Sequence, residues 1–365
     1  MQRSHTGWVM GAVLAALVCP SAARAQLAAP ALDAGSFSQS TLVDNTWFPL
    51  APGTQYVYDG RSDRDGTGLA AAQVVFIVTD VTKVVDGERT VAVLDTDYVD
   101  GAEIEREIHF FAQDDAANVW SLGEYPEEYD GGSFAGAPSA WLSGVDGAQA
   151  GIHFPGTPQA GSPPYVQGIA PNIGFFNAAQ VTATGQSTCV PYGCLGDVVI
   201  TDEFSPDEPD GGGSQKYYAP GVGNVRIEPL NSADQESLQL TSFGTLGEKA
   251  RQKANVRTLR LDARAYGHAT AVWIDSSPAE IDSSPAQMTA GSRSSGGSKL
   301  HTTQAAEDVR ALTRAKPGVV RRAGLTCAGS RPARSARCRP RSSARSRYRC
   351  LARRACGRSR RAPAV

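Results

Sequence analysis

The feature that most constrains the fold is a long run of alternating apolar and polar residues that begins at Gln73. Two Asp-Gly pairs, at residues 86–87 and 100–101, interrupt it, and the alternation continues through residues 103–111 and 118–122. Alternation indicates β-strands, and Asp-Gly between two such runs is typical of a tight hairpin. The pattern therefore predicts a four-strand antiparallel meander with one face buried and the other in water.

One histidine lies within this meander. In residues 103–111 the apolar side chains of Ile104, Ile108 and Phe110 share one face, and His109 falls on the opposite, polar face. A lone histidine on the polar face of a strand is expected to be a surface residue or one whose hydrogen bonds are satisfied, rather than a metal ligand.

Other short runs rich in β-branched and aromatic residues predict further strands, at 55–58, 180–184, 197–201, 215–218, 224–228 and 237–243. About ten strands in meander order favour a mainly β fold, either a curved antiparallel sheet or an incomplete barrel. Residues 125–178 show little periodicity and are predicted to form a long loop, a feature that is often functional.

The period changes over residues 246–267. Val256, Leu259, Ala263 and Tyr266 share one helical face among basic side chains. One C-terminal helix is therefore predicted. It is expected to pack against the sheet or to be solvated, and a membrane-surface helix is the alternative.

The N-terminus has the pattern of a signal peptide. Arg3 precedes an apolar run over residues 8–18, and Ala23-Arg24-Ala25 forms a small-residue cleavage motif. We expect cleavage after Ala25 and export to the periplasm, the cell surface or the extracellular space; an uncleaved anchor is the alternative. No later apolar run is long enough to span a bilayer, so no transmembrane segment is expected after cleavage. Residues 26–44 are interpreted as an N-terminal arm and residues 45–245 as the β domain.

Export makes disulfide bonds possible. Cys189 and Cys194 enclose Val-Pro-Tyr-Gly, a turn that brings its two ends together. The spacing does not fit a thioredoxin-like redox pair, and no second pair accompanies it to complete a zinc site. A structural disulfide is therefore predicted.

Charge is distributed unevenly along the chain. The first 315 residues carry 19 basic and 37 acidic side chains, whereas residues 316–365 carry 16 basic side chains and no acid. An acidic body argues against a nucleic-acid partner for the folded domain. Residues 268–365 are predicted to be a disordered, low-complexity basic tail. We favour a frameshift or read-through origin for it over a functional tail that binds anionic partners.

Carboxylates and aromatic residues gather between residues 110 and 152. The predicted ligand-binding residues are Trp120, Glu124, Tyr125, Tyr129, Trp141 and Asp146. No catalytic residue, metal ligand or cofactor is predicted, because the sequence carries no nucleophile-elbow, zinc-binding or phosphate-loop motif. A calcium-like loop at residues 61–72 lacks the first and twelfth ligands and is expected to be a solvated hairpin.

Several longer motifs carry a resemblance. They are FPLAPGT at residues 48–54, AQDDAANVWSLGE at 112–124, GVDGAQAGI at 144–152 and KYYAPGVG at 216–223. Together they resemble a family of secreted bacterial β-rich proteins without assigned function, over about residues 45–245. The resemblance implies an exported β domain and no family active site. The chain departs from this pattern after Tyr165, where an apolar segment replaces the more acidic one expected.

Three functions remain open at this point. The leading hypothesis is a non-enzymatic module that binds an apolar or mixed small ligand with the concave face of the sheet and the loop at residues 125–178. The second is a secreted hydrolase that uses Glu124 or Asp146 with His153. The third is a structural cell-envelope protein that pairs through an exposed sheet edge. The oligomeric state is not predicted.

Overall fold

The computed structural model describes residues 27–63, 68–208, 211–231 and 235–282. The predicted signal peptide and most of the predicted basic tail lie outside the described residues, as do Asp65 and Gly66 of the calcium-like loop. The strands are β1 (Thr54–Ser62), β2 (Ala70–Val85), β3 (Glu88–Val99), β4 (Ala102–Gln113), β5 (Val119–Asp130), β6 (Ser133–Gly136), β7 (Trp141–Leu142), β8 (Gln149–Phe154), β9 (Tyr165–Ala170), β10 (Phe175–Val190), β11 (Gly193–Phe204), β12 (Gly213–Ala219), β13 (Gly223–Pro229), β14 (Ser237–Thr245) and β15 (Glu280–Ile281). The helices are α1 (Glu248–His268) and α2 (Thr270–Trp273), with single 3-10 turns at Ala34–Ser36 and Pro171–Ile173.

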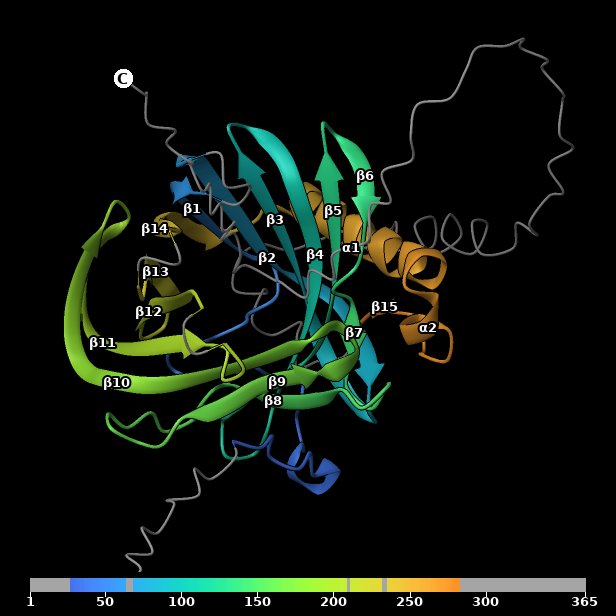
Figure 1. Ribbon diagram of the computed structural model, residues 1–365, viewed down its shortest axis with the longest axis horizontal. Coiled ribbons are helices and arrows are strands. Elements are labelled where there is room, and N and C mark those ends of the chain that lie inside the picture. The colour runs from blue at the N-terminus through green and yellow to red at the C-terminus, as the bar shows by residue number, and fades with distance from the viewer. Residues whose placement is uncertain (1–26, 64–67, 209–210, 232–234, 283–365) are drawn as a thin grey trace, which may run out of the picture.

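Twelve of these strands form a closed antiparallel barrel (Figure 1). Their order around it is β1, β14, β13, β12, β11, β10, β9, β8, β5, β4, β3 and β2, and β1 closes the ring by pairing with both β14 and β2. The mainly β prediction is confirmed, but the open sheet or incomplete barrel of about ten strands is wrong. Closure depends on the pairing of Thr54 with Thr245, which are far apart in the sequence, and no local pattern encodes such a contact.

The barrel gains strands from the segment that was predicted to be a long loop. Residues 125–178 contain β6 to β9 and the end of β5, and β8 and β9 are members of the barrel. Their weak alternation has a steric reason at Gly151, because a Cβ there would lie 2.4 Å from the carbonyl oxygen of Val166 on β9. Glycine allows the two backbones to approach, but it removes an apolar side chain from the pattern.

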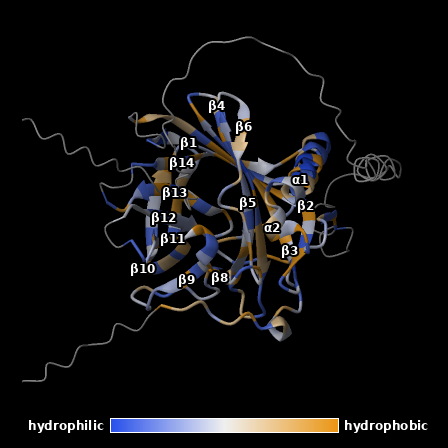
Figure 2. Cartoon of the chain, turned by 45° about the vertical axis from the view of Figure 1, so that its right-hand side comes forward, coloured by the Kyte–Doolittle hydropathy of each residue, from blue (hydrophilic) through white to orange (hydrophobic). Residues whose placement is uncertain are grey.

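Both faces of the β2–β5 meander are covered. The helices α1 and α2 lie beside the meander (Figure 2). On its outer face Ile108, Phe110 and Leu122 are buried against these helices, whose Leu261 and Trp273 are fully enclosed. On its inner face Val91, Val93 and Phe111 belong to a second core inside the barrel. The predicted C-terminal helix is thus confirmed, and it packs on the sheet. The prediction that the polar face is in water is wrong, because that face lines the barrel lumen.

Buried and half-buried ion pairs fasten α1 to the sheet. Lys83 Nζ on β2 lies 2.9 Å from Asp262 Oδ1, with both side chains almost fully buried. Asp80 pairs with Arg251 nearer the start of the helix, and Glu127 pairs with Arg264 nearer its end. Burial lowers the pKa of Lys83, and the adjacent Asp262 opposes that shift.

The predicted disulfide is confirmed. Cys189 and Cys194 are cross-strand partners at the turn between β10 and β11 and are joined by a disulfide bond. Among the described residues, no helix is both long enough and apolar enough to cross a membrane.

Candidate functional site

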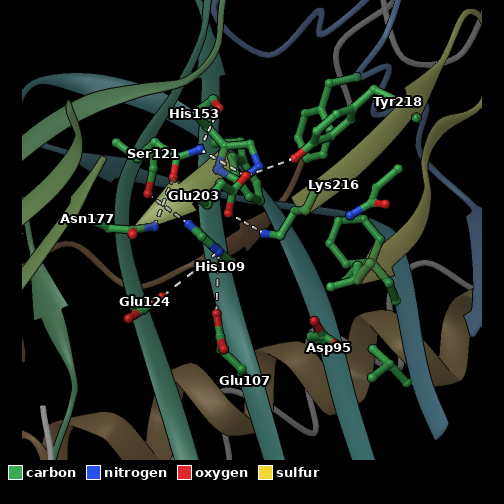
Figure 3. Close-up of a pocket in the computed structure, with 18 of the residues that line it drawn as sticks. Asp95, Glu107, His109, Ser121, Glu124, His153, Asn177, Glu203, Lys216 and Tyr218 are labelled. Carbon is green, nitrogen blue, oxygen red and sulfur yellow. Dashed lines mark hydrogen bonds and ion pairs between the residues drawn. The ribbon is translucent and has the colours of Figure 1, made fainter. Parts of the chain in front are cut away.

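A cavity of about 150 Å³ lies inside the barrel (Figure 3). One part of its wall is apolar and aromatic, with Phe48, Tyr56, Phe111 and Tyr218 among the lining residues. The other part carries two groups of buried polar side chains. The polar faces of the strands, which were expected to meet water, supply this wall.

The first polar group lies on β4 and β5 and is centred on His109. Its Nε2 lies 2.8 Å from Ser121 Oγ. On the other side of the ring, Nδ1 lies 3.4 Å from Oε1 of Glu107 and 4.0 Å from Oε2 of Glu124. Glu107 and His109 face the lumen together because they are two residues apart on one strand.

A bulge in β5 brings Glu124 into this group. Phe110 pairs with Gly123 and Phe111 with Ser121, so Leu122 is an extra residue in the ladder. The bulge allows Ser121 and Glu124, three residues apart, to face the lumen, and it makes Glu124 the direct cross-strand partner of His109. Gly123 has φ +156°, and a Cβ there would lie 2.6 Å from the carbonyl oxygen of Trp141. A glycine is therefore needed beside Glu124.

The second polar group comes from β9 to β12 and is centred on Glu203 of β11 (Figure 3). Its Oε2 lies 2.5 Å from Nζ of Lys216, and its Oε1 accepts hydrogen bonds from Tyr218 (3.1 Å) and Gln167 (3.3 Å). Asn177 in turn donates to Gln167 Oε1 at 2.8 Å. A buried ion pair tied into such a network offers both donors and acceptors to a ligand without a large net charge.

Of the six predicted ligand-binding residues, Glu124 lines the cavity. Trp120 lies on the outer face, where its Nε1 donates to Asp114 at 2.8 Å and its ring packs against Phe37. Tyr125 is fully buried beneath α2, with its ring centroid 5.3 Å from that of Trp273.

The other three lie in different places. The Tyr129 hydroxyl donates to Glu127 near the end of α1, and burial together with that carboxylate raises the pKa of Tyr129 to about 12. Trp141 does not line the cavity, but it stacks on Phe175, which does, with ring centroids 5.4 Å apart. Asp146 is exposed in the turn between β7 and β8. The six residues are thus not gathered around one cavity.

The hydrolase hypothesis named His153 as the partner of Glu124 or Asp146. His153 does line the cavity, where its ring centroid lies 4.6 Å from that of Phe48. The histidine beside Glu124, however, is His109. Sequence reasoning missed Glu107, His109, Ser121, Glu203 and Lys216; their one local signal was a polar residue at every second position of a strand.

No protein-family model matches the chain, and no curated protein matches it. A solved structure from Bacteroides fragilis, described as an exported protein with a YmcC-like fold, is similar over 55% of this chain and 100% of its own, with 14% identity and a TM-score of 0.30. A lipoprotein structure from Parabacteroides distasonis is similar over 55% of this chain and 99% of its own, with 14% identity and a TM-score of 0.27. These TM-scores are too low to support an inference about this chain.

Proposed function

We propose that this chain is an exported protein that binds a small ligand with an apolar body and an uncharged polar end inside its barrel. Export rests on the signal-peptide pattern of residues 1–25. The observation that carries the binding proposal is a cavity inside a closed barrel whose wall is aromatic on one part and polar on the other. Ligand pockets in proteins typically combine an apolar lining with a few convergent polar groups.

Size and chemistry narrow the ligand class. The cavity volume of about 150 Å³ equals that of a protein cavity that holds benzene, so the ligand should have on the order of ten non-hydrogen atoms. Phe48, Phe111 and Tyr218 form an edge-to-face cluster that suits a flat or branched apolar body. At the polar end of the ligand, such as an amide or an alcohol, Glu203 can accept a hydrogen bond and Lys216 can donate one.

A paired substitution tests this proposal. Replacing both partners of a buried ion pair often leaves stability unchanged, whereas removing one leaves a buried charge. The double variant Glu203→Gln with Lys216→Met should therefore fold and lose affinity for small amides or alcohols, measured by calorimetry on a panel of such compounds. The matched control is Arg226→Met with Glu228→Gln, an ion pair outside the cavity lining. No binding by the wild-type chain, or equal affinities in both doubles, would contradict the proposal.

A hydrolase is the second candidate, favoured by one specific observation. Ser121, His109 and Glu107 are arranged as nucleophile, base and orienting acid, with separations of 2.8 and 3.4 Å. In such a reaction Ser121 Oγ would bond to the acyl carbon as its proton moves to Nε2 and the carbonyl π electrons move onto the oxygen, which requires the ring proton on Nδ1. The leaving group would then depart with the proton from Nε2, and water would hydrolyse the acyl-enzyme. Ser121 lies within the sheet, paired in the ladder with Phe111 and Gly151, and not on the strand-to-helix turn that exposes a nucleophile in α/β-hydrolases. Binding without chemistry is therefore favoured.

A fluorophosphonate probe separates the two candidates. A hydrolase would be labelled once per chain, and Ser121→Ala and His109→Gln would each abolish the label. A binding protein would stay unlabelled and still bind amides or alcohols.

The structural-protein hypothesis required a free sheet edge. In the described part of the chain the twelve barrel strands pair on both sides, including β1 with β14 and β2. Among the described strands, the short β6, β7 and β15 each pair with one neighbour, so closure leaves little edge through which such a protein would pair.

A further inference from the structure

We propose that Glu107, His109 and Glu124 bind one divalent transition-metal ion in the barrel lumen. One ligand atom from each residue lies within 4.8 Å of the other two. The proposal rests on the proposed function only in requiring a lumen that solute can enter; it needs no organic ligand.

The separations fit a metal ion. Bonds of about 2.1 Å place neighbouring ligand atoms of a tetrahedral ion about 3.4 Å apart. Nδ1 of His109 lies 3.4 Å from Oε1 of Glu107 and 4.0 Å from Oε2 of Glu124. Because the three ligand atoms lie within 4.8 Å of one another, Glu124 would have to rotate toward Glu107 and His109 for one ion to bond to all three.

Ser121 orients the imidazole for this role. Metal-bound histidines usually donate their other ring N–H to a nearby acceptor, which sets the tautomer and the ring angle. Here Nε2 lies 2.8 Å from Ser121 Oγ, on the side away from the carboxylates. With the proton on Nε2, the lone pair of Nδ1 points toward Glu107 and Glu124. This tautomer is the opposite of the one that a Ser-His-Glu triad needs.

The charge of the cavity favours a cation. Its lining includes five carboxyl groups, from Asp95, Glu107, Glu124, Glu203 and Glu208, against one lysine and two histidines. Lys216 is paired with Glu203. A divalent ion would balance Glu107 and Glu124, both nearly fully buried, where two neighbouring carboxylates would otherwise repel each other.

The donor atoms of these three residues narrow the choice of metal. Imidazole nitrogen suits zinc, copper, iron and nickel, and carboxylate oxygen also suits manganese, whereas calcium and magnesium prefer oxygen alone. Three protein ligands leave at least one position open toward the lumen, the arrangement found where a metal ion also binds water or a small molecule.

Cobalt titration of the full, untagged chain after dialysis against chelator tests the proposal. Residues 316–365 contain four cysteines, Cys327, Cys338, Cys350 and Cys356. Visible absorption separates the lumen site from these cysteines, because cobalt bound to thiolates shows intense charge-transfer bands. We expect one equivalent bound through nitrogen and oxygen. Glu124→Gln and His109→Gln should each weaken binding by at least about 100-fold, and Ser121→Ala by about 10-fold. His153→Gln, which removes the other lumen histidine, is the matched control and should leave the affinity unchanged.

Three outcomes would overturn the assignment: no cobalt binding by the wild-type chain, binding unchanged in Glu124→Gln and His109→Gln, or equal loss in His153→Gln. Circular dichroism of each variant separates a lost site from a lost fold. Failure of this proposal is distinguishable from failure of the proposed function. Cobalt binding should persist in the Glu203→Gln/Lys216→Met double variant, and binding of amides or alcohols is measured without metal.

Discussion

His109 and Glu124 are direct cross-strand partners on β4 and β5, and their Nδ1 and Oε2 atoms lie 4.0 Å apart inside the barrel. The pair exists because an extra residue in β5 turns Glu124 inward and because α1 covers the other face of the same strands. The candidate site and the docking of the helix are therefore two results of one arrangement.

Substitution of Gly123 should disturb both stability and the site. Gly123→Ala places a Cβ 2.6 Å from the carbonyl oxygen of Trp141 at φ +156°, so the β5 bulge must shift. We expect a loss of roughly 2 kcal/mol or more in the free energy of unfolding, measured in urea, together with weaker cobalt binding. The control is Gly244→Ala, because a Cβ there meets no atom within 4 Å. Equal effects of the two substitutions would contradict the steric argument.

The Lys83–Asp262 pair should be a large contributor to helix docking. Asp262 accepts from Lys83 and from the Trp273 indole, each at 2.9 Å, and all three side chains are buried. Asp262→Ala leaves the lysine charge buried without its carboxylate, which should reduce the free energy of unfolding by about 3–5 kcal/mol. Asp275→Ala, at an exposed position on the same segment, should change it by less than about 0.5 kcal/mol. Chemical denaturation followed by circular dichroism measures both.

Acid should weaken the packing of the C-terminal end of α1, because it protonates Glu127. Burial alone would raise the pKa of this carboxyl, but hydrogen bonds from Arg264, Tyr129 and Tyr125 outweigh burial and lower it. A lowered folded-state pKa means that ionised Glu127 stabilises the fold above its unfolded-state pKa of about 4.3. That contribution is lost as the pH falls through the lower, folded-state value.

The measurement is the free energy of unfolding as a function of pH. In Glu127→Gln the free energy of unfolding should fall less steeply as the pH drops below about 4.3, because the variant has no carboxylate to protonate at that position. Glu280→Gln removes an exposed acid and should leave the decline as it is. If the free energy of unfolding of Glu127→Gln fell with pH in parallel with that of the wild type, Glu127 would not be the cause of the acid destabilisation.

The disulfide should add a modest stability. Cys189 and Cys194 close a loop with a sequence separation of 5. On chain entropy a loop this short contributes about 2 kcal/mol. The double substitution Cys189→Ala with Cys194→Ala should therefore lower the free energy of unfolding by that amount and leave cobalt binding intact, since the bridge joins β10 to β11 and touches neither β4 nor β5. A loss of cobalt binding would show that the β10–β11 turn shapes the lumen.

Much of the fold could be predicted from local pattern. Alternation identified the meander, Asp-Gly pairs placed two of its turns, and the period change located α1. The strands within residues 149–170 were not predicted, because Gly151 and Gly168 leave gaps in the alternating pattern. Both glycines are needed where backbones or rings approach closely. Of the residues that line the candidate site, the sequence analysis named Glu124 and, in the hydrolase hypothesis, His153. The partners of Glu124 were not predicted, because they are ordinary polar residues that a bulge in β5 brings together.

The sequence by itself determined what is local: strand periodicity, tight turns, one amphipathic helix and a disulfide across a short turn. Tertiary structure alone decided that β1 meets β14, that α1 covers the apolar face of the meander, and that the polar face consequently encloses a cavity. The physical reason is that alternation assigns side chains to two faces of a strand but does not say which face turns inward. Packing between distant segments makes that choice, and here it brings Glu107, His109 and Glu124 together.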